Sequence, residues 1–168
     1  DCSAASDGPA LPFYAARFPQ AFPASVLRAA SGGAELHLAG SIGCGQTVSG
    51  DTATQVDQRG HESPDELRKF VVRRRCEVGF DLCDSEYDSL LRVLSADGAV
   101  EYAKNDDHAS CCEGRDHKEF RRAVNMHCPY AKLGSVALEP GEYLVQVEGY
   151  SRYEGPYRLK MECHSDCG

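Results

Sequence analysis

Apolar and polar side chains alternate along much of the chain after Gly43. The segments 76–82, 143–147 and 157–163 each carry an apolar or aromatic residue at every second position. A period of two residues places alternate side chains on opposite faces of an extended strand. The sequence therefore predicts β-strands in these three segments. A shorter or less regular form of the same pattern predicts further strands at 35–39, 46–49, 67–73, 90–94, 100–104 and 134–138.

Turn-forming residues separate several of the predicted strands, at 96–98, 139–141 and 154–156. Many short strands with one polar face, joined by tight turns, predict an all-β fold, an antiparallel β-sandwich or jelly roll. The polar interval 108–130 fits this pattern poorly, and we expect a long loop there with a short helix near 118–124. The residues predicted to form the core are Val78, Phe80, Leu91 or Leu90, Val145, Val147 and Leu159.

Residues 1–34 differ from the remainder of the chain. They hold four of the eight prolines together with Phe13, Tyr14, Phe18 and Phe22. Dense proline breaks both helices and strand ladders, so we expect an irregular N-terminal arm with at most a helical turn near 24–30. The predicted division is thus an arm over 1–34 and a sandwich domain over 35–168.

The aromatic content of the arm has two explanations. A flexible linker does not need so many aromatic side chains, because exposing them lowers solubility. The arm either packs on its own domain, the commoner case, or docks on a neighbouring chain. The second alternative predicts self-association or a protein partner through the arm, which a covalent bridge would strengthen.

Composition excludes some classes of function. The chain has 168 residues and a formal net charge of −8, whereas a protein that binds a phosphate backbone needs a concentrated basic face. We therefore expect no nucleic-acid partner. Apolar runs are much shorter than the roughly 18 residues of a membrane-spanning helix, so we expect no membrane span.

The chain contains nine cysteines, which is far above ordinary usage. Cysteine-dense chains of this size are usually secreted, because disulfides persist in oxidising compartments. A zinc site would need two closely spaced pairs, and the spacing here favours disulfides instead. We therefore expect a secreted protein, extracellular or at a cell surface. The cysteines expected in disulfides are Cys44, Cys76, Cys83, Cys111, Cys112, Cys128 and Cys163.

Two pairings are predicted within this set. Cys83 is expected to pair into the 111–128 loop, because both flank the acidic segments described below. Cys163 is expected to pair with a cysteine of another strand, Cys76 or Cys44. Cys2 and Cys167 lie outside the periodic strands, and the odd total leaves one cysteine over. We therefore expect Cys2 and Cys167 to be available for interchain bridges.

Short motifs follow one another along the chain at 45–52, 63–67, 80–83, 87–93, 105–107, 138–150 and 155–159. Their order resembles the bacterial pre-peptidase C-terminal domain, in the cysteine-bearing form of secreted and surface proteins. The resemblance covers about residues 43–163. It implies a non-catalytic β-sandwich module of the kind attached to proteases and other secreted proteins. The loop 109–128 is longer and richer in cysteine than that pattern, and a CUB-like sandwich is the alternative fold.

Catalytic motifs are absent from the sequence. It contains six histidines but no G-x-S-x-G elbow, and His61-Glu62 is not followed by a second histidine at H-E-x-x-H spacing. Cysteines in disulfides cannot serve as thiolate nucleophiles. We therefore expect no catalytic residues and no enzymatic activity.

Acidic residues gather beside two predicted strands. Asp88 precedes the strand at 90–94, and Asn105, Asp106 and Asp107 follow the strand at 100–104. Antiparallel pairing of these strands would bring the four side chains together, as a set of hard oxygen ligands for Ca²⁺. The alternative is that they only form turns through their own backbone. Calcium is the only cofactor that the sequence suggests, and none is required.

Tyr150 and Tyr153 lie in the predicted turn before the last strand. Aromatic side chains on a sandwich surface can stack on sugar rings, so this pair is a candidate glycan site. Nearby Tyr157 is assigned to the core by the alternation of its strand.

These observations predict a non-catalytic extracellular module with a structural, assembly or adhesion role, as in a surface or filament subunit. One alternative is a carbohydrate-binding module, assisted by calcium. Another is an accessory domain of a secreted protease.

Overall fold

The computed structural model describes residues 35–113 and 128–168. The arm and the two expected helical segments, at 24–30 and 118–124, lie outside these residues. The described chain is all-β, as predicted, with two short 3₁₀ helices, η1 (Thr52–Thr54) and η2 (Ala109–Cys112). The strands are β1 (Leu38–Ser41), β2 (Thr47–Asp51), β3 (Asp65–Val72), β4 (Cys76–Asp81), β5 (Ser89–Ser95), β6 (Glu101–Asn105), β7 (Lys132–Leu138), β8 (Gly141–Gly149) and β9 (Pro156–Cys163).

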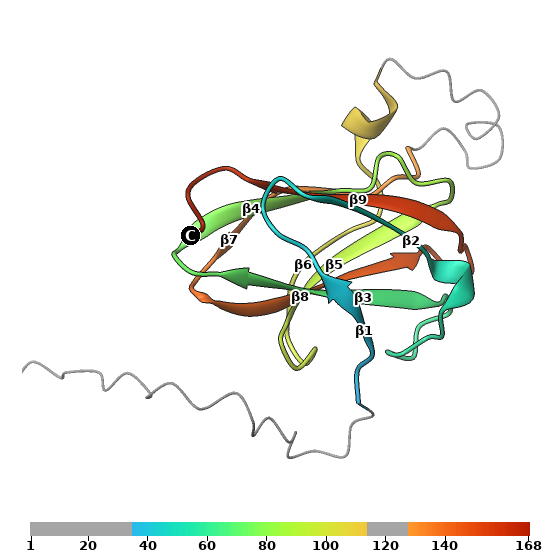
Figure 1. Cartoon of the computed structure of the whole chain (residues 1–168). Helices are drawn as coiled ribbons and strands as arrows, with labels where there is room; N and C mark the ends of the chain where they lie inside the picture. Colours follow the sequence, from blue (N-terminus) through green and yellow to red (C-terminus); the bar gives the residue numbers. More distant parts are fainter. Residues whose placement is uncertain (1–34, 114–127) are drawn as a thin grey trace, which may run out of the picture. The chain divides into compact units, whose positions relative to one another are not determined.

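The strands form two sheets that face each other (Figure 1). One sheet has the order β1-β3-β8-β5-β6 and the other has the order β2-β9-β4-β7. All pairs are antiparallel except β1 and β3, which run parallel. The predicted antiparallel sandwich is therefore confirmed with this one departure. Its cause is that β2 crosses to the other sheet between β1 and β3, so the chain returns in its original direction.

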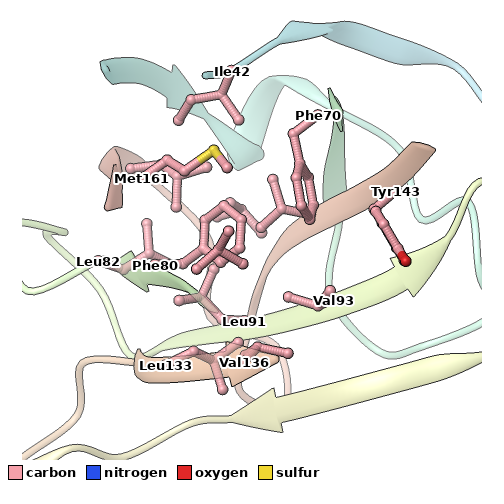
Figure 2. Close-up of a cluster of buried hydrophobic side chains, with 14 of the residues drawn as sticks. Ile42, Phe70, Phe80, Leu82, Leu91, Val93, Leu133, Val136, Tyr143 and Met161 are labelled. Atoms are coloured by element: carbon pink, nitrogen blue, oxygen red, sulfur yellow. The ribbon is translucent and has the colours of Figure 1, made fainter. Parts of the chain in front are cut away.

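The hydrophobic core lies between the two sheets. Phe70 from one sheet meets Phe80 from the other with ring centroids 5.1 Å apart, and Phe70 also stacks on Tyr143 at 5.5 Å. Figure 2 shows these rings surrounded by aliphatic side chains from both sheets. Leu91, not Leu90, faces this core. The other predicted core residues, Val78, Phe80, Val145, Val147 and Leu159, are all at most 1% exposed.

A polar cluster crosses the same interior. Tyr157 on β9 donates its hydroxyl hydrogen to Glu66 on β3, and Arg68 Nη2 donates to the same carboxylate at 2.5 Å. Arg68 Nε also donates to the Tyr157 hydroxyl at 3.2 Å. Burial and the bond to Glu66 raise the pKa of Tyr157, so the phenol stays protonated. A side chain at Gly50 would lie 2.5 Å from the Tyr157 hydroxyl, so glycine is required there.

The outer face of the larger sheet is also covered. Leu67, Leu94 and Leu144 form a second apolar cluster there, and Leu36 packs against it from outside the sheet. Residues 57–63, in the loop between β2 and β3, cover a neighbouring part of this face. Arg59 from this loop donates to the Gly98 carbonyl at 2.5 Å.

Four disulfides connect the described cysteines: Cys44–Cys163, Cys76–Cys167, Cys83–Cys111 and Cys112–Cys128. The predicted pairing of Cys83 into the loop is confirmed, and Cys163 takes Cys44, one of its two expected partners. The prediction of an interchain role for Cys167 is wrong. The C-terminal segment folds back so that the Cys167 carbonyl accepts from the Arg73 amide at 2.9 Å, beside Cys76.

Truncation of Phe80 to alanine tests the central packing. Because Phe80 is 1% exposed and contacts Phe70, Phe80→Ala should lower the free energy of unfolding by about 3–5 kcal/mol. Denaturant unfolding followed by circular dichroism measures the loss. Val56→Ala is the control, because Val56 is 70% exposed and its truncation should change stability by less than about 0.5 kcal/mol. Equal effects of the two substitutions would contradict the packing described here.

Candidate functional site

The turn between β8 and β9 lies against the start of β5. The Tyr150 amide donates to the Asp88 carbonyl at 2.9 Å, and the Tyr153 amide donates to the Tyr150 carbonyl at 3.1 Å. The first bond fastens the turn to the strand that begins at Ser89, and the second closes the turn on itself. Both sequence-predicted features, the tyrosine pair and Asp88, therefore meet at one end of the larger sheet.

Three local features fix the shape of this turn. A Cβ atom at Gly149 would lie only 1.7 Å from the Tyr153 carbonyl oxygen, so the backbone can fold back this closely only at glycine. Ser151 adopts a positive φ of 55°. Ser63 Oγ donates to the Gly149 carbonyl at 2.8 Å and accepts from the Gly149 amide at 3.1 Å. The turn is thus fixed by bonds from the β2–β3 loop as well as by its own residues.

The two tyrosines of the turn face solvent. Tyr150 is 51% exposed and Tyr153 is 44% exposed, whereas Tyr157 is 2% exposed. The assignment of Tyr157 to the core is therefore confirmed. Both side chains are therefore accessible to a ligand, and sugar stacking at this turn stays a prediction.

Asp88 is a buried carboxylate at the same end of the sheet. Its residue is 7% exposed, and its pKa is raised to about 6 by burial and by the neighbouring charges of Asp107 and Asp106. The antiparallel pairing of β5 with β6 brings these residues together, as the sequence reasoning expected. Three carboxylates therefore share one region.

Asn105 is engaged differently. Its Oδ1 accepts from the Lys132 amide at 3.0 Å, and its Nδ2 donates to the Asp107 carbonyl at 3.1 Å. Asp106 Oδ1 accepts from the Asp107 amide at 3.0 Å. The last two are the local bonds of a turn, which was the alternative explanation of the motif, while the first attaches Asn105 to the start of β7. The calcium site at Asp88, Asn105, Asp106 and Asp107 stays a prediction, with Asp88 as its most buried carboxylate.

A polar cleft of about 420 Å³ opens on the smaller sheet beside the Cys83–Cys111 disulfide. It contains both signs of charge. Asp81 on β4 and its register partner Lys132 on β7 form an ion pair at 2.9 Å in its lining, which also includes Arg158 and Lys160. Most of the lining is polar or charged, so the cleft does not suit an apolar ligand.

Sequence reasoning missed a buried polar cluster on the outer face of the larger sheet. Asp65 on β3 lies directly opposite Glu148 on β8, and both are at most 1% exposed. His61 Nδ1 lies 2.7 Å from Glu148 Oε2, and Arg92 Nε donates to Glu148 Oε1 at 2.7 Å. Gln146 Nε2 bridges the two carboxylates at 3.2 Å and 3.0 Å.

The only sequence signal for this cluster was the pair of polar positions, 146 and 148, on the outward side of a strand. Such positions were expected to face solvent. Burial raises the pKa of Asp65 to about 6, and the nearby charge of Glu148 adds to the shift. Asp65 is thus held at a higher energy when ionised than an exposed aspartate.

Comparisons with known proteins address the fold. The sequence matches no protein-family model and no curated protein. Among solved structures, the chain is similar to the pre-peptidase C-terminal domain of a collagenase from Bacillus anthracis, with a TM-score of 0.50 and 14% identity. The alignment covers 77% of this chain and 100% of that domain.

The chain has the fold of a pre-peptidase C-terminal domain. The family resemblance that the sequence motifs predicted is therefore confirmed at the level of the fold. Four disulfides are consistent with an oxidising compartment. Within residues 35–113 and 128–168, no helix is long and apolar enough to cross a membrane.

Replacing Asp88 with asparagine tests the acidic group. The raised pKa means that folding favours the protonated carboxyl, so this contribution is fully present below about pH 4 and is lost as the pH rises through about 6. Without calcium, Asp88→Asn should therefore melt at a higher temperature than the wild type at pH 7, and the difference should shrink towards pH 4. Thermal melting across this pH range measures the effect.

The same variant tests calcium. If the carboxylates bind Ca²⁺, millimolar Ca²⁺ should raise the melting temperature of the wild type relative to chelator, and Asp88→Asn should not respond. Glu86→Gln is the matched control, because Glu86 is an exposed acidic residue on the same connection. An identical melting temperature of the wild type in calcium and in chelator would leave the motif as a turn alone.

Proposed function

We propose that this chain is a secreted, non-catalytic accessory module that joins an extracellular assembly through its N-terminal arm. The observation that carries the proposal is the pairing of the cysteines. Four disulfides within the sandwich join eight of the nine cysteines, and Cys2 is left as the odd one. A leftover cysteine in a secreted chain favours an intermolecular bridge.

The position of Cys2 supports this proposal. It precedes the four aromatic residues of the arm, Phe13, Tyr14, Phe18 and Phe22, each of which can bury about 150–250 Å². Burying two of them on a partner contributes several kcal/mol, which offsets only part of the cost of ordering the arm. A disulfide at Cys2 supplies a further constraint at one end of the same segment.

The sandwich fits the role of a stable support. Its core and disulfides lie within the described residues, and the similar domain of the Bacillus anthracis collagenase is, by its description, a module of a larger protein. An accessory domain of a secreted protease is a specific form of the same proposal.

Removing the arm tests the assembly. Light scattering should give the full chain a mass larger than that of a monomer. On a non-reducing gel, the full chain should run as a dimer that reducing agent converts to monomer. Cys2→Ser should remove the reducible species, and deletion of residues 1–34 should leave a folded monomer with the melting temperature of the sandwich. If the full chain and the truncated chain are both monomeric at high concentration, the arm has no assembly role.

A second candidate function is glycan binding at the turn between β8 and β9. The observation that favours it is the exposure of Tyr150 and Tyr153, 51% and 44%, on a turn fixed by bonds to Asp88 and Ser63. A fixed turn presents the rings without a large entropic cost on binding. The acidic group of Asp88, Asp106 and Asp107 supplies the region in which calcium would assist.

Binding to immobilised polysaccharides tests this candidate. Tyr150→Ala and Tyr153→Ala should each weaken binding by about tenfold, the loss of one aromatic stacking contact. Tyr102→Ala is the matched control, because Tyr102 is 50% exposed but lies on β6. If all three variants bind as the wild type does, the tyrosine pair has no part in glycan recognition.

A further inference from the structure

The buried cluster on the outer face of the larger sheet places two acids of the same charge opposite each other. Asp65 and Glu148 are register partners across β3 and β8, an arrangement that destabilises a sheet when both are ionised. One cation, Arg92, reaches Glu148, but Arg92 is also paired with Glu101 at 2.5 Å. The positive charge of Arg92 is therefore shared between two glutamates, and it does not fully balance the negative charges of Asp65 and Glu148.

Two buried oxygens of the cluster, Asp65 Oδ1 and Gln146 Oε1, have no hydrogen-bond partner among the described residues. Asp65 Oδ2 accepts from the Gln58 amide and from Gln146 Nε2, each at 3.2 Å. Asp65 Oδ1 is fully buried and contacts no donor among the described residues. A buried carboxylate oxygen without a donor costs free energy that a bound cation would recover.

An imidazole completes the set. Ligand atoms of His61, Asp65 and Glu148 all lie within 4.8 Å of one another. The side chain of His61 is 34% exposed, whereas that of Glu148 is 2% exposed. The histidine therefore gives an ion a route from solvent to the two buried acids.

We propose that His61, Asp65 and Glu148 form a binding site for a divalent transition metal of the zinc class. Zn²⁺ takes the place of the proton shared by His61 Nδ1 and Glu148 Oε2, and Asp65 supplies a carboxylate oxygen. Tetrahedral ligands bonded to zinc at about 2 Å lie about 3.3 Å apart, so closing the set from separations of up to 4.8 Å needs displacements of up to about 1.5 Å. Water at the solvent side of His61 completes the coordination.

The ligand types select the metal. Calcium takes six to eight oxygen ligands, and magnesium takes an octahedron of oxygens, whereas this cluster offers an imidazole nitrogen and few free oxygens. Imidazole combined with carboxylate suits zinc and its neighbours in the transition series. The site therefore differs in chemistry from the predicted calcium region at Asp88.

The metal would fasten the β2–β3 loop to the sheet. His61 lies in this loop, and two residues later Ser63 holds the β8–β9 turn through its bonds with Gly149. The Glu62 carboxylate accepts from Ser151 Oγ of the same turn at 3.0 Å. A metal at His61 thus stabilises the segment that supports Tyr150 and Tyr153.

Zinc titration of the full chain tests the site. A Cys2→Ser background removes the odd thiol, because the eight described cysteines are in disulfides and do not compete for metal. In this background, calorimetry should detect one Zn²⁺ per chain at micromolar zinc, and zinc should raise the melting temperature. Co²⁺ should give the visible absorption of a low-symmetry nitrogen–oxygen site, and Ca²⁺ should not displace it.

Four variants test which residues bind the metal. His61→Gln and Asp65→Asn should each weaken zinc affinity by about tenfold or more. His37→Gln should not, because His37 is an exposed histidine whose backbone, not its ring, bonds to Gln58. Asp88→Asn should also retain zinc, which separates this site from the calcium region. Absence of zinc binding by the Cys2→Ser chain, or equal affinity of His61→Gln and His37→Gln, would overturn the proposal.

Discussion

Burial of strand β8 on both faces is the constraint on which the structure depends. Every residue from Tyr143 to Gly149 is buried. Val145 and Val147 face the second sheet, which explains why the sandwich must close over them. Gln146 and Glu148 face the other way and need polar partners, because an unpaired buried polar group is costly. The β2–β3 loop supplies one of those partners, His61, while β3 supplies Asp65 and β5 supplies Arg92.

The sequence predicted the strands well, because alternation reports directly which side chains share a face. All nine predicted segments contain strands, and their boundaries differ by a few residues. Alternation does not report whether a face is covered. Gln146 and Glu148 look like solvent-facing positions in the pattern, yet the covering segment near His61 is irregular and has no period to reveal it. The zinc-class cluster could not be predicted for this reason.

The sequence predicted a disulfide partner only where it also predicted which segments lie side by side in the sheets. Cys83 paired into the predicted loop because that loop follows the acidic segments that the strands bring together. Cys167 lies beyond the last strand, and distance from the periodic segments was a poor guide to its partner. Its position is set by the return of the C-terminal segment to Arg73, where the backbone bonds place it beside Cys76. Such a contact depends on tertiary structure that short-range sequence patterns do not contain.

The β2–β3 loop connects the buried and exposed parts of the candidate site. His61 and Asp65 lie against Glu148 beneath it, while Glu62 and Ser63 hold the turn that carries Tyr150 and Tyr153. Neighbouring residues of one short segment therefore contact both the sheet and the turn. A change in the charge beneath the loop must be accommodated either by the sheet, which is packed on both faces, or by the loop. Because loops deform at lower cost than packed strands, we expect the loop to take up most of such a change.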